Sequence, residues 1–122
     1  TKAVTEVLPQ LKGKLSGASI RVPTPNVSLI DFVFHAARAT DENEINALLE
    51  EAAAGPFAGI LATTSEPLVS VDFNHHPASV TVDLAETKVT DQHLVRILGW
   101  YDNEWGFANR LLETARQMAA QL

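Results

Sequence analysis

The chain has 122 residues, of which 46% are hydrophobic, and a formal net charge of −6 at pH 7. This length allows one domain with one sizeable core, and the acidic balance argues against nucleic-acid partners, because phosphate backbones are bound by basic surfaces. The chain lacks cysteine, which excludes disulfides, a thiolate nucleophile and cysteine-based metal sites within it.

The sequence also carries information on membrane spans, on a signal peptide and on the start of the chain. No apolar run reaches the roughly 18 residues of a membrane span, and the start has no signal-peptide pattern, so we expect a cytoplasmic protein with no membrane partner. Residue 1 is Thr rather than an initiator Met, and a helical pattern begins directly after it. We therefore expect the sequence to be part of a longer chain.

The first segment predicts a short helix, a turn and a strand. Apolar residues recur at helical spacing over 4–11, and Pro9 marks the end of that helix. Residues 18–22 predict a strand that carries Arg21. The loop 23–25 has a proline on each side of its threonine, which holds it extended.

Arg21 stands immediately before this rigid loop. A guanidinium in such a place can hold an anion through a fork of charge-assisted hydrogen bonds. An ordinary surface arginine has the same sequence pattern. The residues alone favour the surface interpretation.

Residues 27–37 are the longest predicted strand. Apolar side chains occupy most positions on both faces, which is typical of a central, buried strand. Asp31 and His35 share one face and allow a polar pair. Because that spacing is common, we assign the two residues no catalytic role.

The middle of the chain predicts a helix followed by strands. Asp41 and Glu44 resemble a capping box at the start of the helix, and Gly55 predicts a left-handed cap at its end. Further strands are predicted at 57–62, 68–73, 79–84 and 92–101, with a turn at 86–87.

Two neighbouring histidines, His75 and His76, raise the question of a metal site. Adjacent residues of an extended chain point to opposite sides, so one ion does not easily take both. No third ligand is evident. The sequence therefore predicts no metal site.

The junction between the last strand and the last helix is the most distinctive place in the chain. An apolar run over 93–101 stops at Asp102 and Asn103, and a helical pattern over 104–122 begins at once. A helix start attracts ligands, since it has unpaired N–H groups and a positive dipole end. Asn103 is a preferred helix N-cap residue, and its amide can also donate to and accept from a planar carboxamide. Both roles stay open.

Three segments carry a resemblance to a known family. Residues 100–110 read WYDNEWGFANR, residues 20–28 read IRVPTPNVS and residues 69–75 read VSVDFNH. In this order and spacing they resemble the C-terminal part of the phosphorylating glyceraldehyde-3-phosphate dehydrogenase family. The resemblance implies an α+β fold with a mixed, mainly antiparallel sheet, helices on one face and a long C-terminal helix. Residues 1–103 then belong to the catalytic and tetramerisation domain, and residues 104–122 form a helix that packs on an NAD-binding domain.

The resemblance also implies functional residues. Arg21 occupies the position of a family arginine that binds the substrate or inorganic phosphate. Asn103 matches an asparagine that contacts the nicotinamide carboxamide of NAD, and Tyr101 matches a residue that lines the nicotinamide side of the site. The family's cysteine nucleophile, histidine base and glycine-rich dinucleotide motif are expected before Thr1. Alone the sequence is expected to be inactive, and it is expected to act within an NAD-dependent homotetramer on a phosphorylated aldehyde.

Two substrates are compatible with the resemblance. Residues 71–75 and 104–110 are more similar to the erythrose-4-phosphate branch, which makes 4-phosphoerythronate for pyridoxal phosphate biosynthesis. Tyr101 is instead usual in the glycolytic glyceraldehyde-3-phosphate branch. From the sequence we favour erythrose-4-phosphate. One alternative is a non-catalytic α+β binding or oligomerisation module, because the cysteine, the glycine motif and an initiator Met are missing. A weaker alternative is a ferredoxin-like regulatory domain, because predicted strands and a helix alternate.

Overall fold

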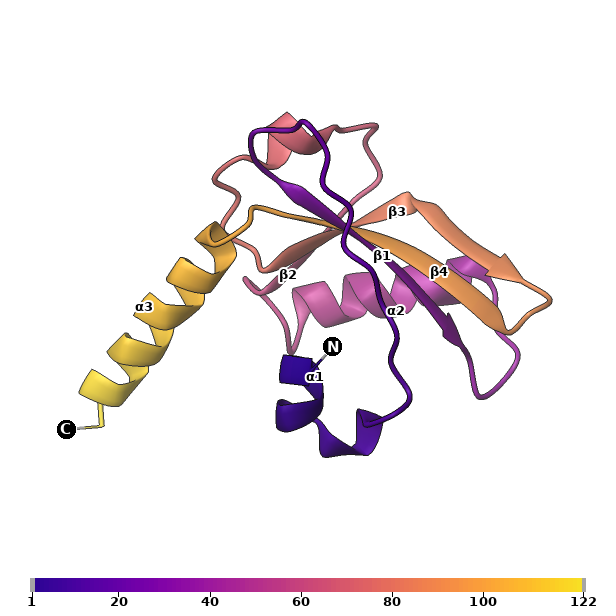
Figure 1. Ribbon diagram of the computed structural model, residues 1–122, viewed down its shortest axis with the longest axis horizontal. Helices are drawn as coiled ribbons and strands as arrows, with labels where there is room; N and C mark the ends of the chain where they lie inside the picture. The colour runs from indigo at the N-terminus through magenta and orange to yellow at the C-terminus, as the bar shows by residue number, and fades with distance from the viewer. Residues whose placement is uncertain (1, 122) are drawn as a thin grey trace.

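The computed structural model describes residues 2–121 (Figure 1). In chain order its elements are α1 (Lys2–Val7), η1 (Pro9–Leu11), β1 (Ser28–His35), α2 (Glu42–Ala54), β2 (Leu61–Thr64), η2 (Ser70–Phe73), β3 (Val80–Thr90), β4 (Leu94–Tyr101) and α3 (Trp105–Ala119), where η1 and η2 are 3₁₀ helices. The first helix ends before Pro9, as predicted, because proline cannot continue its hydrogen-bond pattern.

The strands form one mixed sheet in the order β1-β4-β3-β2. β4 pairs antiparallel with β1 and with β3, and β2 pairs parallel with β3. α2 packs against β2 and β3 (Figure 1). The predicted α+β class is confirmed. The core is centred on the two inner strands, whose buried apolar side chains are Val82, Leu84, Val95 and Leu98.

β1 lies at an edge of the sheet, so the prediction of a central, buried strand over 27–37 is wrong. Ile30 is 48% exposed, Phe32 43% and Val33 51%, and within the described sheet the strand is hydrogen-bonded to β4 alone. An apolar pattern on both faces indicates side chains that suit burial. The pattern does not show whether those side chains are buried by this chain or by another part of the protein.

Asp31 and His35 have different partners in the structure. The Asp31 carboxylate accepts a fork of hydrogen bonds from Arg96, at 2.8 Å from Nε and 3.0 Å from Nη2. This fork lowers the pKa of Asp31 below its ordinary value. The His35 ring stacks on His93 with 5.3 Å between ring centres. Both residues therefore have structural roles across the sheet.

Residues 18–22 form no strand, against the prediction. The segment crosses in front of β1 (Figure 1), and Ile20 is 84% exposed. A short apolar stretch becomes a strand only where a neighbour pairs with it, since sheet propensity depends on context. Arg21 consequently lies on an extended segment outside the sheet.

Two other predicted strands are largely replaced, one by turns and the other by a 3₁₀ helix. Residues 57–60 form turns, with Gly59 at φ +77°, and β2 begins only after them. The strand predicted at 68–73 is wrong, because η2 occupies that place. The Asp72 carboxylate accepts a hydrogen bond from the backbone N–H of Val69 at 2.8 Å. Such a local side-chain bond gives the backbone an alternative to a sheet ladder.

The turn predicted at 86–87 lies inside β3. The register between β3 and β4 shifts between Asp83 and Lys88, which marks a bulge rather than a reversal. The chain reverses at Asp91 and Gln92, whose φ angles are 50° and 57°. Two successive positive φ angles are typical of a tight hairpin turn.

α2 begins as predicted and ends differently. The Asp41 carboxylate accepts from the backbone N–H of Glu44 at 2.8 Å. The Glu44 carboxylate binds Arg38 and also the hydroxyl of Thr40, and these bonds lower the pKa of Glu44 from 4.5 to about 2. Gly55 closes the helix at φ −115°, so the predicted left-handed cap is wrong.

α3 projects from the sheet (Figure 1). Arg110 ties it to the body by donating to the carbonyl of Gly59 at 3.0 Å and the hydroxyl of Ser79 at 3.3 Å. Its exposed apolar side chains are Phe107, Leu111, Leu112 and Met118. The helix confirms most of the prediction for 104–122, of which residue 122 lies outside the described part. Within residues 2–121 no helix combines the length and apolar character needed to cross a membrane.

Candidate functional site

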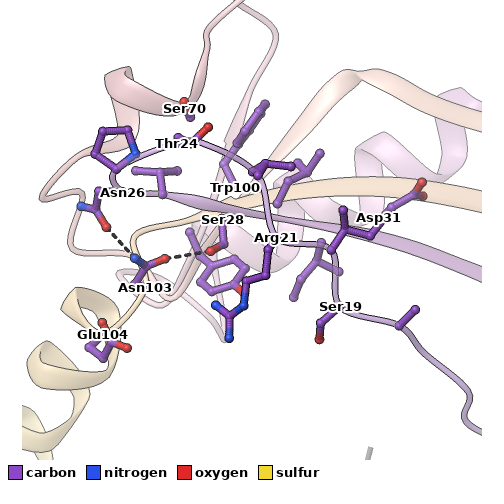
Figure 2. A pocket seen from close by; sticks show the side chains of 18 residues that line it. Ser19, Arg21, Thr24, Asn26, Ser28, Asp31, Ser70, Trp100, Asn103 and Glu104 are labelled. Carbon is purple, nitrogen blue, oxygen red and sulfur yellow. Dashed lines mark hydrogen bonds between the residues drawn. The ribbon is translucent and has the colours of Figure 1, made fainter.

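A hollow of about 1090 Å³ lies between the extended segment 18–26, the start of β1 and the end of β4. Figure 2 shows it from close by. Its lining includes Arg21, Tyr101 and Asn103, which are the three residues singled out from the sequence. They are brought together from positions 80 residues apart, because β1 pairs with β4 and both strands carry their junctions to the same end.

Arg21 is the cationic group of this hollow. Within residues 2–121 its guanidinium has no ion-pair or hydrogen-bond partner, whereas Arg38, Arg96 and Arg110 each pair with a carboxylate. In Figure 2 its side chain extends into the open side of the hollow. An exposed guanidinium with all its donors available suits an anion such as a phosphate group.

Asp102 is the buried anion behind the hollow. It is 6% exposed. One carboxylate oxygen accepts from the side-chain amide of Asn26 at 2.9 Å, and the other accepts from the backbone N–H of His75 at 2.6 Å. Two donors therefore compensate a charge that would otherwise be costly to bury.

Asn103 is held by hydrogen bonds on both ends of its amide (Figure 2). Its Nδ2 donates to Oδ1 of Asn26 at 2.8 Å, and its Oδ1 accepts from the hydroxyl of Ser28 at 2.7 Å. The helix N-cap role considered for Asn103 is wrong, because Glu104 occupies that position and the start of α3 has no side-chain cap. The amide is instead available to the hollow, with one N–H and one lone pair unused.

Aromatic side chains support the same end of the sheet. Tyr101 is the register partner of Ser28 and is half-buried at the hollow. Trp100 stacks on the buried Phe73 with 5.6 Å between ring centres, so its main role is packing.

The two histidines considered as metal ligands have separate surroundings. The ring of His75 lies against Trp105 with 4.4 Å between ring centres. The Nδ1 atom of His76 is 3.3 Å from the hydroxyl of Thr81. Among residues 2–121 no three His, Asp or Glu side chains gather in a way that would hold a metal ion.

Sequence reasoning missed Asn26, Ser28 and Asp102 as members of the site. All three stand inside the segments that carry the family resemblance. A charged residue at the end of an apolar strand was a usable signal, because a buried carboxylate needs donors nearby. What the sequence did not reveal is that those donors come from residues 26 and 75.

Residues 1–103 match a family model described as glyceraldehyde 3-phosphate dehydrogenase, C-terminal domain. A glyceraldehyde-3-phosphate dehydrogenase of Cereibacter sphaeroides is 58% identical over 121 residues, which make up 99% of this chain and 36% of that protein. The one of Xanthobacter flavus is 58% identical over 117 residues, or 96% of this chain and 35% of that protein. The one of Zymomonas mobilis is 56% identical over 122 residues, or 99% and 36%. The chain thus spans about a third of the length of these relatives.

Proposed function

This chain belongs to the glyceraldehyde-3-phosphate dehydrogenase family, and we propose that it forms the C-terminal part of an NAD-dependent dehydrogenase acting on a phosphorylated aldehyde. The observation that carries the proposal is the hollow itself. It brings together the guanidinium of Arg21, which is unpaired in the described part of the chain, an available amide at Asn103 and the ring of Tyr101. These are the chemical groups that a phosphate and a nicotinamide need.

Each residue has a distinct part in the proposal. Arg21 binds the phosphate of the substrate or inorganic phosphate through charge-assisted hydrogen bonds. Asn103 donates to and accepts from the carboxamide of the nicotinamide ring, which fixes the face that the ring presents, and Tyr101 lines that side of the site. NAD, when bound beside these residues, would supply the hydride acceptor. We propose that the cysteine nucleophile and histidine base belong to the rest of the enzyme, because this chain contains no cysteine and spans about a third of its relatives.

The substrate we propose is glyceraldehyde-3-phosphate. The sequence motifs favoured erythrose-4-phosphate, but relatives at 55–58% identity carry the name glyceraldehyde-3-phosphate dehydrogenase. Tyr101, usual in that branch, agrees with them. The two aldehydes differ by one CHOH group, so the erythrose substrate is the competitor that the assay has to include.

The proposal extends to assembly. We assign residues 1–103 to the catalytic and tetramerisation domain and 104–122 to a helix that packs on the NAD-binding domain. The exposed apolar side chains of β1 and α3 support this assignment, because surfaces of this kind are normally covered by a partner.

The decisive assay measures NAD reduction by the natural full-length protein with each aldehyde, in the presence and absence of inorganic phosphate. We expect a higher kcat/KM for glyceraldehyde-3-phosphate and a dependence on phosphate. A preference for erythrose-4-phosphate would restore the competing substrate. No NAD reduction with either aldehyde would favour a non-catalytic binding or oligomerisation module.

A further inference from the structure

Asp102 does not line the hollow, but its carboxylate is hydrogen-bonded to Asn26, which does. Its carboxylate faces Asn26 and the backbone of His75, while Asn103, the next residue, faces the hollow. A buried carboxylate that the proposed chemistry does not use calls for another explanation. The hydrogen bonds around it form a directed chain from Asp102 to Asn26, Asn103 and Ser28.

The direction of this chain follows from the chemistry of the groups. An ionised carboxylate accepts hydrogen bonds and donates none. Asn26 must therefore turn its Nδ2 towards Asp102, and the same Nδ2 also donates to Oδ1 of Asn74 at 2.6 Å. Oδ1 of Asn26 therefore faces Asn103, and Asn103 has to donate a hydrogen bond to it through its own Nδ2. The negative charge of Asp102 thus fixes the orientation of two amides in succession.

Ser28 completes the arrangement from the other side. Its hydroxyl donates to Oδ1 of Asn103 at 2.7 Å. With Nδ2 committed to Asn26 and Oδ1 to Ser28, the amide of Asn103 cannot flip without breaking both bonds. Its remaining N–H and its remaining lone pair therefore point in fixed directions.

The backbone is strained at two places that make these contacts possible. Val27 has φ 69° and is 7% exposed, and His75 has φ 60°. A β-branched residue in this region is an outlier, and such strain is held only where the surroundings over-determine it. Val27 lies between Asn26 and Ser28, both of which bind Asn103, and the backbone N–H of His75 binds Asp102.

We propose that Asp102 is a positioning residue that acts through Asn26 to fix which end of the Asn103 amide meets a carboxamide ligand. The proposal rests on the proposed function, in which that ligand is the nicotinamide of NAD. It assigns Asp102 and Asn26 a part in cofactor recognition although neither touches the cofactor. Their effect is on the affinity for NAD rather than on the chemical step.

The test uses three variants of the full-length protein. In Asp102→Asn the fixed direction of the chain is lost. In Asn26→Asp two carboxylates face each other where Asn26 donates to Asp102, and their repulsion displaces the acceptor of Asn103. For both variants we expect the KM for NAD to rise roughly three- to tenfold while kcat changes less. The exchange variant, Asn26→Asp with Asp102→Asn, places the carboxylate at position 26. There it accepts from Asn103 and from the new amide, and Asn74, which is exposed, turns its own amide to donate. We expect this variant to restore the KM for NAD.

A stability control separates positioning from packing. Asp72→Asn removes the carboxylate that binds the backbone of Val69, outside this chain of hydrogen bonds. It is expected to lower the melting temperature and to leave the KM for NAD unchanged. If Asp102→Asn fails to fold, Ser28→Ala serves instead. It removes the bond to Oδ1 of Asn103 without touching Asp102, and it should raise the same KM.

The KM for NAD of these variants decides whether Asp102 is a positioning residue. Restoration by the exchange variant supports the positioning role of Asp102. A raised KM in Ser28→Ala supports the fixed Asn103 amide on which that role depends, and an unchanged KM in Ser28→Ala overturns it. An active wild type in which the single variants leave the KM for NAD unchanged, or in which a folded exchange variant stays impaired, overturns the inference alone. A folded wild type that does not reduce NAD overturns the proposed function, and the inference with it.

Discussion

At the scale of single residues, the guanidinium of Arg21 has no partner within residues 2–121, whereas Arg38, Arg96 and Arg110 are each paired with a carboxylate. The sequence singled out Arg21, Tyr101 and Asn103, and the structure places all three at one hollow. It did not reveal the bonds that hold Asn103, because they join residues 75 and 77 positions apart. The spacing of residue types describes only neighbours along the chain, whereas these contacts depend on the pairing of β1 with β4.

Replacing Arg21 should weaken the binding of the phosphorylated substrate. Because a hydrogen bond to a charged group contributes roughly 1.5–3 kcal/mol, we expect Arg21→Ala to raise the KM for the aldehyde phosphate roughly 10- to 150-fold. Steady-state kinetics of the full-length protein measure this. Arg38→Ala, which removes an equal charge outside the hollow, should leave that KM unchanged. Equal KM values for both variants would remove Arg21 from the site.

Because the pKa of Glu44 is lowered in the folded state, we expect the stability of the protein to depend on pH. Hydrogen bonds from Arg38 and then Thr40 lower its folded-state pKa from 4.5 to about 2. The unfolded state therefore takes up the proton first as the pH falls. The contribution of this group is complete above pH 4.5, declines between pH 4.5 and 2, and is lost below that window. The side chains of Arg38 and Glu44 are both partly exposed, so screening by solvent keeps the contribution of this ion pair to stability small.

Urea unfolding at several pH values tests the role of Glu44. In Glu44→Gln the free energy of unfolding should depend less steeply on pH between 4.5 and 2. Glu51→Gln removes the same charge elsewhere on α2 and provides the comparison. The account of Glu44 fails if the two variants have the same slope in this window.

At the scale of elements, regular patterns were predicted better than irregular ones. α2 and its cap at Asp41 follow directly from spacing and cap chemistry. η2 was mistaken for a strand, because alternating apolar residues outweighed the local bond of Asp72. Residues 18–22 lack a strand partner, and the turn at 86–87 is a bulge in β3. These features depend on tertiary pairing, which local spacing does not contain.

Gly106 fixes how α3 leaves the sheet. A Cβ built on this glycine would lie 2.9 Å from the carbonyl oxygen of Ala78 and 3.1 Å from the Cα of Ser79. Both are backbone atoms, so the helix would have to move. We expect Gly106→Ala to destabilise the protein by about 1–3 kcal/mol, despite the better helix propensity of alanine.

Urea unfolding of the full-length protein measures the effect of Gly106→Ala. The comparison is Ala115→Gly, an exposed position on α3 where only helix propensity changes, with a cost of about 1 kcal/mol. A Gly106→Ala variant as stable as the wild type would show that α3 does not depend on this close approach.

At the scale of the whole molecule, the sequence predicted the α+β class and the mixed sheet, because three family segments fall in order along the chain. It predicted burial of β1 on both faces, while β1 and α3 both carry exposed large apolar side chains. The side chains suit burial, and the cover we propose comes from the rest of a longer enzyme and its other subunits. A chain that spans about a third of its relatives fits that account.

The central claim is that the hollow holds the phosphate and the nicotinamide of one dehydrogenase site. The crystal structure of the full-length protein with NAD and inorganic phosphate tests it most directly. We predict a phosphate within hydrogen-bond distance of the Arg21 guanidinium and the nicotinamide carboxamide on the free side of the Asn103 amide. A structure in which both ligands are bound away from these residues would contradict the account.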